Sequence, residues 1–172
     1  LVDRLARVLY HTPFPKMAAK AHRRLLEVDR GRAVDDATYD ASYRELVAPG
    51  LGAVAQIGNT YTASLYVCLA ASLEDEGRSL AGRRIGLFSY GSGCCAEFFT
   101  GIVPAGAATL GPTGVREALA RRTLVDVATY ERLLADGERG GTPPTDFTGD
   151  FVFRGVRDDL RVYERARGAL AA

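Results

Sequence analysis

The sequence predicts an α/β protein built on a layered mixed sheet with one helix buried at its centre. Short apolar runs typical of strands occur at residues 8–10 and twice within residues 83–103. Between them, residues 61–73 carry apolar side chains on nearly every side of a helix, which indicates a helix without a solvent-exposed face. Helices that alternate with strands in this way cover a sheet on its faces.

The first strand, at residues 8–10, ends at His11, and the apolar spacing predicts a helix from residue 14 to about Val28. The end of a strand just before a helix is where α/β folds place reactive groups. His11 is therefore a candidate hydrogen-bond donor facing a pocket. The alternative is a core histidine whose ring is satisfied by the backbone.

The chain contains 20 arginines and two lysines, Lys16 and Lys20, which lie one helical turn apart. Arg23 and Arg24 continue the same side, so a basic face begins at the N-terminus of this helix. A solvated helix face is the ordinary explanation of such a pattern. The compact charge of lysine also suits phosphate, which makes a phosphate-binding face the functional alternative.

A more polar helix is expected over residues 35–48, followed by a break at residues 49–52. The buried helix over residues 61–73 comes next, with Asn59 or Thr60 as its capping residue. Buried amide groups at the start of such a helix need hydrogen-bond partners. Asn59 can be only this cap, or it can direct its amide at a carbonyl oxygen of a ligand.

Residues 83–103 predict a strand, a Gly-Ser-Gly turn and a second strand. Ser92 lies between the two glycines, which either form a tight turn or let the backbone approach a ligand. A dinucleotide-binding fingerprint is disfavoured because a strand follows the glycines where a helix is required. The Gly-x-Ser-x-Gly elbow of hydrolases would need glycine where Tyr90 and Cys94 stand.

The cysteines are three in number, Cys68, Cys94 and Cys95, and they lack the spacing of a metal site. An odd count predicts free thiols in a cytoplasmic protein rather than a disulfide framework. Cys94 and Cys95 are better explained as small, half-buried residues at a strand start than as nucleophiles. His11 and His22 also lack ligand spacing, so we expect no metal.

Length and charge exclude further classes. With 172 residues, 47% of them hydrophobic, the chain suffices for one sizeable domain. The net charge is +1 and basic residues are spread among acidic ones, which disfavours a nucleic-acid-binding protein. Because no apolar run is long enough to cross a bilayer, no membrane association is expected.

The end of the chain predicts two short helices, a loop and a last strand. The helices are expected at residues 115–122 and 126–135, the loop at 137–148, and the strand with a polar tail from residue 151. The chain starts at Leu1 without an initiating methionine. We therefore expect a piece of a longer product or a processed chain.

Three segments together resemble the hydroxymethylglutaryl-CoA synthase family: YHTPFPKMAAKAHR at 10–23, GNTYTASLY at 58–66 and RIGLFSYGSGCCAEFF at 84–99. They occur in the family's order and at plausible separations. The resemblance covers nearly all of residues 1–172, most weakly from residue 137 onward. It implies the thiolase-like fold, with the whole chain forming its C-terminal half.

The resemblance also implies roles for five residues. His11 matches the active-site histidine that holds the acetoacetyl thioester and polarises its ketone. Lys16 and Lys20 match positions that bind coenzyme A. Asn59 and Ser92 match positions that contact the acyl substrate. A histidine for the carbonyl would thus be followed by two ammonium groups for the coenzyme A tail.

The family's reaction requires two further groups. A cysteine nucleophile carries an acetyl group, and a glutamate base removes a methyl proton so that the enolate can attack the ketone of the second substrate. Both belong to the N-terminal half, and Cys68, Cys94 and Cys95 lie in the wrong motifs to replace that nucleophile. The chain alone is therefore not expected to catalyse the full reaction. It should bind a polypeptide that carries the missing half, in a homo- or hetero-oligomer.

Three functional alternatives remain open from the sequence. The first is a condensing enzyme using coenzyme A thioesters, as in mevalonate supply, with no cofactor beyond these substrates. The second is a polyketide β-branching synthase whose acceptor is attached through phosphopantetheine to an acyl carrier protein. The third is a non-catalytic subunit that binds acyl thioesters or stabilises a partner. A dinucleotide-dependent reductase is a fourth alternative, which the strand after the Gly-Ser-Gly turn disfavours.

Overall fold

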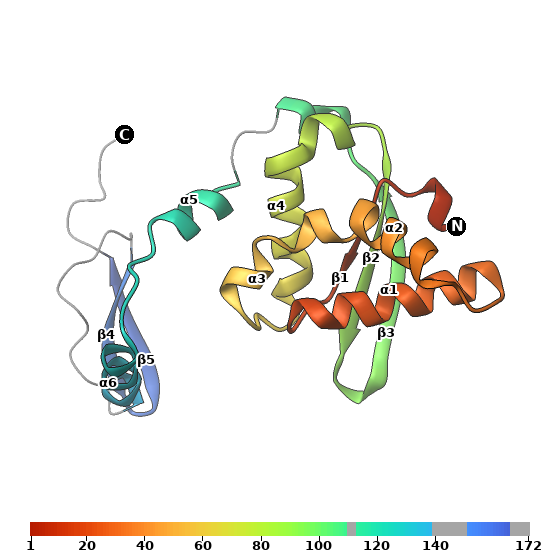
Figure 1. Cartoon of the computed structure of the whole chain (residues 1–172). Helices are drawn as coiled ribbons and strands as arrows, with labels where there is room; N and C mark the ends of the chain where they lie inside the picture. Colours follow the sequence, from red (N-terminus) through yellow and green to blue (C-terminus); the bar gives the residue numbers. More distant parts are fainter. Residues whose placement is uncertain (110–112, 139–150, 166–172) are drawn as a thin grey trace. The chain divides into compact units, whose positions relative to one another are not determined.

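A computed structural model describes residues 1–109, 113–138 and 151–165 of the chain (Figure 1). These residues form two compact units, Leu1–Arg122 and Thr123–Ala172. The first unit contains all of the residues singled out by the sequence motifs. Within the described ranges, every helix is too short or too polar to span a membrane.

The first unit is built on a three-stranded sheet of β1 (Arg7–Tyr10), β2 (Arg84–Gly91) and β3 (Cys95–Ile102), in the order β1-β2-β3. β1 pairs with β2 in parallel, with Tyr10 opposite Phe88. β2 and β3 form an antiparallel hairpin. The sheet is therefore mixed, as the sequence predicts.

Helices and single 3-10 turns connect and cover these strands. The helices of the first unit are α1 (Pro15–Arg30), α2 (Asp36–Leu46), α3 (Val54–Ile57), α4 (Ala63–Leu80) and α5 (Val115–Ala120). The 3-10 turns are η1 (Val2–Arg4), η2 (Ala48–Leu51), η3 (Ser92–Cys94) and η4 (Ala105–Thr109). The short helix α3 falls in a segment for which the sequence predicts no element.

The helices lie on both faces of the sheet. Tyr10 of β1 contacts His22 of α1, whereas Arg7 of the same strand pairs with Glu76 of α4. Residues three apart on a strand point to opposite faces. α1 therefore covers one face and α4 the other, with α2 packed against α1 (Figure 1).

The boundaries of α1 follow from its sequence. Pro15 stands at the first turn, where its missing N–H costs no hydrogen bond. At the other end Gly31 adopts a left-handed conformation with φ of 67°, and its N–H donates to the carbonyls of Glu27 and Val28. The helix runs two residues beyond the predicted end because a glycine, and no earlier breaker, stops it.

α4 is longer than predicted, and its cap differs from the prediction. It begins after Thr62, which makes no capping hydrogen bond with its side chain. Asn59 accepts a hydrogen bond from the N–H of Tyr61 at 2.8 Å, before the helix starts, so its predicted role as cap is wrong. The helix continues to Leu80 because its acidic stretch is paired, with Asp75 bonded to Arg116 and Glu76 to Arg7.

α4 packs on the sheet through one side, with Leu65 and Cys68 each 1% exposed. On another side Tyr66 is 60% exposed. The expectation of burial on nearly every side is therefore not met by the described residues. A helix with apolar residues on an uncovered side needs further protein to cover it.

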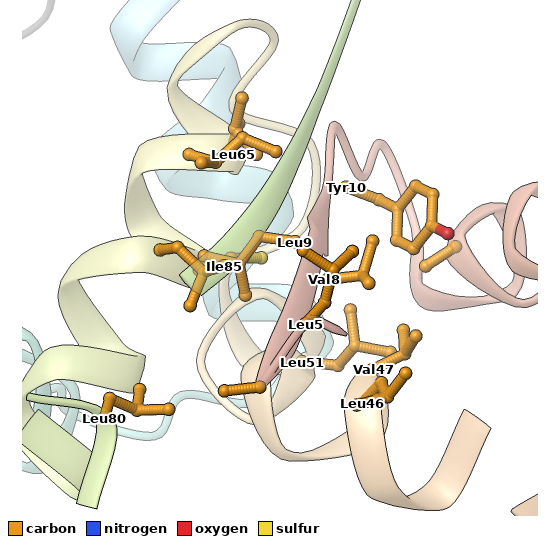
Figure 2. Packing of buried hydrophobic residues seen from close by; sticks show 14 of the residues in the cluster. Leu5, Val8, Leu9, Tyr10, Leu46, Val47, Leu51, Leu65, Leu80 and Ile85 are labelled. Carbon is orange, nitrogen blue, oxygen red and sulfur yellow. The ribbon is translucent and has the colours of Figure 1, made fainter. Parts of the chain in front are cut away.

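One continuous core joins β1 to the helices on both faces (Figure 2). Leu9 of β1 is 2% exposed and packs closely on η2, where a Cβ added at Gly50 would lie 2.8 Å from its Cδ2 atom. The residues labelled in Figure 2 are Leu5, Val8, Leu9, Tyr10, Leu46, Val47, Leu51, Leu65, Leu80 and Ile85.

The second unit contains α6 (Val127–Glu138) and a hairpin of β4 (Phe151–Arg157) and β5 (Leu160–Arg165). The predicted helix at 126–135 is confirmed, whereas the predicted single closing strand is in fact two strands. Asp158 and Asp159 form the turn between them, with φ of 48° and 61°. Aspartate tolerates this left-handed region better than most residues. The predicted loop at 137–148 lies mostly outside the described residues.

Burial of His22 predicts that stability depends on pH. Its desolvated imidazole has a pKa lowered from 6.5 to about 4, so protonation favours the unfolded chain. Stability from this group should be complete above pH 6.5 and lost as the pH falls towards 4, by about 3 kcal/mol in total. Urea unfolding at pH 7 and pH 4.5 measures this loss.

His22→Gln provides the control, because glutamine does not titrate. Carboxylates such as Asp3 and Asp29, whose pKa is lowered by their basic partners, also lose stability in acid. Their effect is common to both proteins, so the wild type should lose more stability than the variant between the two pH values. Equal losses would contradict the assignment.

Candidate active site at the carboxyl ends of two parallel strands

His11 follows β1 directly and lies at the edge of the sheet where β1 and β2 both end. Its backbone N–H donates to the carbonyl of Phe88 at 2.7 Å, which extends the parallel pairing by one residue. Its ring centroid is 6.2 Å from that of Tyr90. The side chain is partly exposed, as a group that meets a substrate must be.

The start of α4 is attached to the same edge. The N–H of Thr12 donates to Oγ of Ser64 at 2.9 Å, and the Thr12 hydroxyl donates to the carbonyl of Tyr10 at 2.5 Å. Both Thr12 and Ser64 are fully buried. The hydrogen bond to Ser64 places the start of α4 against the residue that follows His11. Sequence analysis does not single out either residue, although both lie inside the motif segments.

Two polar atoms in this region are buried and make no hydrogen bond within the described part of the chain: Nδ1 of His11 and Oγ1 of Thr60. A buried polar group without a partner costs about 1–3 kcal/mol, so native proteins rarely retain one without a reason. Both atoms are therefore available to a ligand oxygen or hydroxyl. Thr60 was expected only as a possible helix cap.

Asn59 lies in the same loop and is exposed. Because its Oδ1 accepts from Tyr61 at 2.8 Å, only its –NH2 group remains to donate towards a substrate. The loop is held in an unusual conformation, with φ of 85° at Gly58 and 51° at Tyr61. A non-glycine residue in the left-handed region costs free energy, and such positions cluster at functional sites.

Ser92 begins the turn η3 at the end of β2. Gly93 and Cys94 both adopt positive φ, of 77° and 59°, which reverses the chain tightly into β3. The predicted turn is thus confirmed, and the strand after it excludes a dinucleotide fingerprint. Figure 1 shows this turn, the start of α4 and the start of α1 at the same end of the first unit.

Lys16 and Lys20 are exposed on the first turns of α1, beside this edge. The arginines that follow them are engaged: Arg23 and Arg24 each pair with a carboxylate, at 2.8 and 3.3 Å. The predicted basic face is therefore narrower than four residues. Its available charge comes from the two lysines, which are absent from the ion pairs of the described residues.

The buried cysteine is not an activated nucleophile. Cys68 is buried on α4, and burial raises the pKa of its thiol to about 11, which keeps it protonated. Cys94 and Cys95 are exposed at the turn and the start of β3, whereas half-burial was expected. Among the described residues no group of three or more histidine, cysteine or acidic side chains could hold a metal.

Comparisons with known proteins identify relatives over most of the chain. The sequence profile described as hydroxymethylglutaryl-coenzyme A synthase C terminal matches residues 32–139. The chain is 36% identical over 132 residues to the Bacillus subtilis polyketide biosynthesis 3-hydroxy-3-methylglutaryl-ACP synthase PksG, covering 76% of this chain and 31% of that protein. It is 37% identical over 128 residues to the hydroxymethylglutaryl-CoA synthase of Enterococcus faecalis, covering 74% and 32%.

Solved structures of the same group of synthases are similar to this chain in fold as well as in sequence. MvaS in complex with 3-hydroxy-3-methylglutaryl coenzyme A superposes with a TM-score of 0.77 at 40% identity, over 95% of this chain and 42% of that one. The curacin pathway HMG synthase in complex with apo donor-ACP gives a TM-score of 0.79 at 32% identity, over 95% and 44%.

The chain thus spans about a third of the length of the curated relatives it matches. The profile covers well over half of the chain, and its description names the C-terminal part. The α/β architecture with a mixed sheet agrees with the thiolase-like fold of these relatives. The chain belongs to the hydroxymethylglutaryl-CoA synthase family, and it corresponds to the C-terminal part of that family's proteins.

Proposed function

We propose that the chain supplies the acceptor-binding half of a condensing enzyme. The enzyme would add an acetyl group, carried as a thioester on its cysteine, to an acetoacetyl or other β-ketoacyl thioester. Water would then hydrolyse the cysteine thioester, which releases the hydroxymethylglutaryl-type product and restores the thiol. The observation that carries this proposal is the position of His11 at the shared end of β1 and β2. The next residue, Thr12, is hydrogen-bonded to Ser64 at the start of α4, and the His11 ring lies 6.2 Å from that of Tyr90, two residues before the turn at Ser92.

In this proposal His11 acts on the ketone. The enolate carbon of the acetyl group forms a bond with the ketone carbon, and the C=O electron pair moves onto the oxygen. A hydrogen bond from the His11 imidazole stabilises the resulting alkoxide, by about 3 kcal/mol, and the alkoxide then takes up a proton. Asn59 and Ser92 would hold the acyl thioester so that its ketone meets this donor.

The acetyl-carrying cysteine and the glutamate base are proposed to come from another polypeptide, or from another part of a longer product. Support comes from the length of the relatives and from apolar surface without a cover in the described residues. Tyr61 and Tyr66, by α4, are 76% and 60% exposed. β1 and β3 are the outer strands of the described sheet, and each pairs with a strand on one side only. An apolar pocket of about 240 Å³ also opens between α1 and the sheet.

Native mass spectrometry of the purified material tests this requirement, together with denaturing masses of each component. We expect a stable complex with a second polypeptide whose sequence supplies the cysteine and the glutamate. A lone species at the chain mass of 18.5 kDa would contradict it. The interface of a permanent complex should exceed about 2,000 Å² and survive transfer to the gas phase as one particle.

Lys16 and Lys20 favour a coenzyme A thioester as acceptor, because the two ammonium groups can bind the 3′-phosphate of its adenosine. A carrier protein presents phosphopantetheine without that phosphate. The second candidate is nevertheless supported, because one relative is named as an ACP synthase. The curacin enzyme was solved with a donor-ACP, so that relative binds a carrier protein on its donor side. Neither candidate requires a cofactor beyond the coenzyme A or phosphopantetheine thioesters that serve as substrates.

Lys16→Ala separates the two candidates. We expect the KM of the assembled enzyme for acetoacetyl-CoA to rise about tenfold, because a charge-assisted hydrogen bond to phosphate is worth about 1.5–3 kcal/mol. The KM for a carrier-borne acceptor should stay within twofold. Arg32→Ala, at an exposed arginine beyond α1, is the matched control and should leave both unchanged. Equal KM increases for both acceptors would exclude the coenzyme A assignment.

A non-catalytic subunit that binds acyl thioesters is the third candidate, and the kcat of the assembled enzyme with His11→Ala decides between it and a catalytic role.

We also propose a cytoplasmic location. It is supported by three thiols without a disulfide partner, of which Cys68 is buried and Cys94 and Cys95 are exposed.

A further inference from the structure

His22 is a buried side chain of α1 that the proposed reaction does not use. It is fully buried and lies two residues after Lys20 and six after Lys16, on the same helix. Three tyrosine rings, those of Tyr10, Tyr39 and Tyr43, lie within 6.4 Å of its ring centroid. An imidazole in such an environment needs partners for both nitrogens.

Both nitrogens have partners, and each partner belongs to a different element. Nδ1 lies 3.0 Å from the hydroxyl of Tyr10, the last residue of β1, and Nε2 lies 2.9 Å from Oγ of Ser42 on α2. One ring therefore joins β1, α1 and α2. The hydroxyls of Tyr10 and Ser42 can each donate or accept, so either neutral tautomer of the imidazole satisfies both hydrogen bonds.

The hydrogen bond to Tyr10 reaches the residue next to His11. The carbonyl of Tyr10 accepts from the Thr12 hydroxyl, and the Thr12 N–H donates to Ser64 of α4. The end of β1 is thus held from both faces of the sheet, through His22 on one and Ser64 on the other. His11 lies between these two attachments.

The same ring determines how α1 lies on β1. An α-helix turns by about 100° per residue, so Lys16 and Lys20 point roughly 120–160° away from the direction of His22. If α1 rotated or slid enough to break the bond to Tyr10, both lysines would move relative to His11. A thioester that touches His11 at one end and the lysines at the other requires that spacing to be fixed.

We infer that His22 is a positioning residue: its hydrogen bond to Tyr10 fixes α1 on β1, and so sets the distance between His11 and the two lysines. This inference rests on the proposed function, because it concerns the substrate that spans those groups. His22 itself touches no substrate. Its effect should therefore depend on how far the substrate extends.

Tyr10→Phe tests this effect, since it keeps the buried ring and removes only the hydroxyl. Two acceptors are compared in the assembled enzyme, acetoacetyl-CoA and the shorter S-acetoacetyl-pantetheine, which carries no phosphate for the lysines to bind. We expect the KM advantage of the coenzyme A substrate to fall about tenfold, as in Lys16→Ala. Combining both substitutions should add little, because they remove the same interaction.

Tyr39→Phe is the matched control. The Tyr39 hydroxyl donates to the carbonyl of Ala19 at 3.2 Å and joins α2 to α1 without involving β1. Its loss should leave the ratio of the two KM values unchanged. A merely structural role for Tyr10 would lower stability and affect both acceptors equally, and that result would overturn the inference. His22→Asn, which keeps an acceptor near the Nδ1 position, should preserve more of the ratio than His22→Gln.

Nuclear magnetic resonance separates failure of the inference from failure of the proposed function. The chain has two histidines, so the imidazole region contains two ring systems, which His11→Ala assigns. We expect Tyr10→Phe to shift the Nδ1 resonance of His22 and also the ring resonances of His11, because the end of β1 is then no longer held by His22. Unchanged His11 resonances would overturn the inference. If Lys16→Ala leaves the KM for acetoacetyl-CoA unchanged, the coenzyme A assignment fails, whereas the resonances still measure the coupling between His22 and His11.

Discussion

Replacing His11 by alanine is expected to lower kcat for condensation by the assembled enzyme about 100- to 1,000-fold. Negative charge develops on the ketone oxygen only as the new C–C bond forms. A donor that interacts mainly with this charge stabilises the transition state more than the bound substrate, so KM should change little. Steady-state rates with acetyl-CoA and acetoacetyl-CoA measure both parameters.

The variant should remain folded. The partly exposed ring of His11 fills no core space, and its backbone hydrogen bond to Phe88 does not depend on the side chain. Circular dichroism and the thermal midpoint verify this. His11→Asn retains a neutral donor and should recover part of the rate. Unchanged kcat in the alanine variant would instead favour the non-catalytic subunit.

The parts of the fold that could be predicted are those with local signals. β1 is a short apolar run, α1 starts at Pro15 and has an apolar stripe, and the β2–β3 hairpin turns at Gly-Ser-Gly. The candidate site follows from these elements, because the ends of parallel strands meet at one edge. For this reason the position of His11 is predictable although its neighbours across the sheet are not.

The parts that could not be predicted depend on partners far along the chain. The acidic stretch of α4 reads as a helix end, yet it stays helical because Asp75 and Glu76 pair with Arg116 and Arg7. The sequence places Arg23 on the basic face of α1. In the structure its charge is paired with Asp36, thirteen residues later. Propensity contains no information about such pairs, since they form only after the elements pack.

The role of Asn59 shows the same limit at a shorter range. Capping preference alone places it at the start of a helix, and both asparagine and threonine satisfy that preference. In the structure Asn59 lies three residues before the N-cap Thr62, and its Oδ1 accepts from the N–H of Tyr61 in a loop where Gly58 and Tyr61 have positive φ. A strained loop of this kind is specified by the surrounding fold, so no sequence window of a few residues predicts it.

Leu9→Ala should lower the free energy of unfolding of the chain by about 3 kcal/mol, within the range of 2–5 kcal/mol for buried leucines. Leu9 is 2% exposed and packs against η2 so closely that a Cβ atom added at Gly50 would clash with the Leu9 side chain. Neither element can move inwards without shifting the other, so the cavity should persist. Urea unfolding followed by circular dichroism measures the loss as a lower midpoint at unchanged slope.

Val28→Ala, at a position 64% exposed, is the control and should change stability by less than about 0.5 kcal/mol. A loss below about 1 kcal/mol for Leu9→Ala would mean that the core relaxes around β1, and the fixed strand end that His11 requires would then be in error.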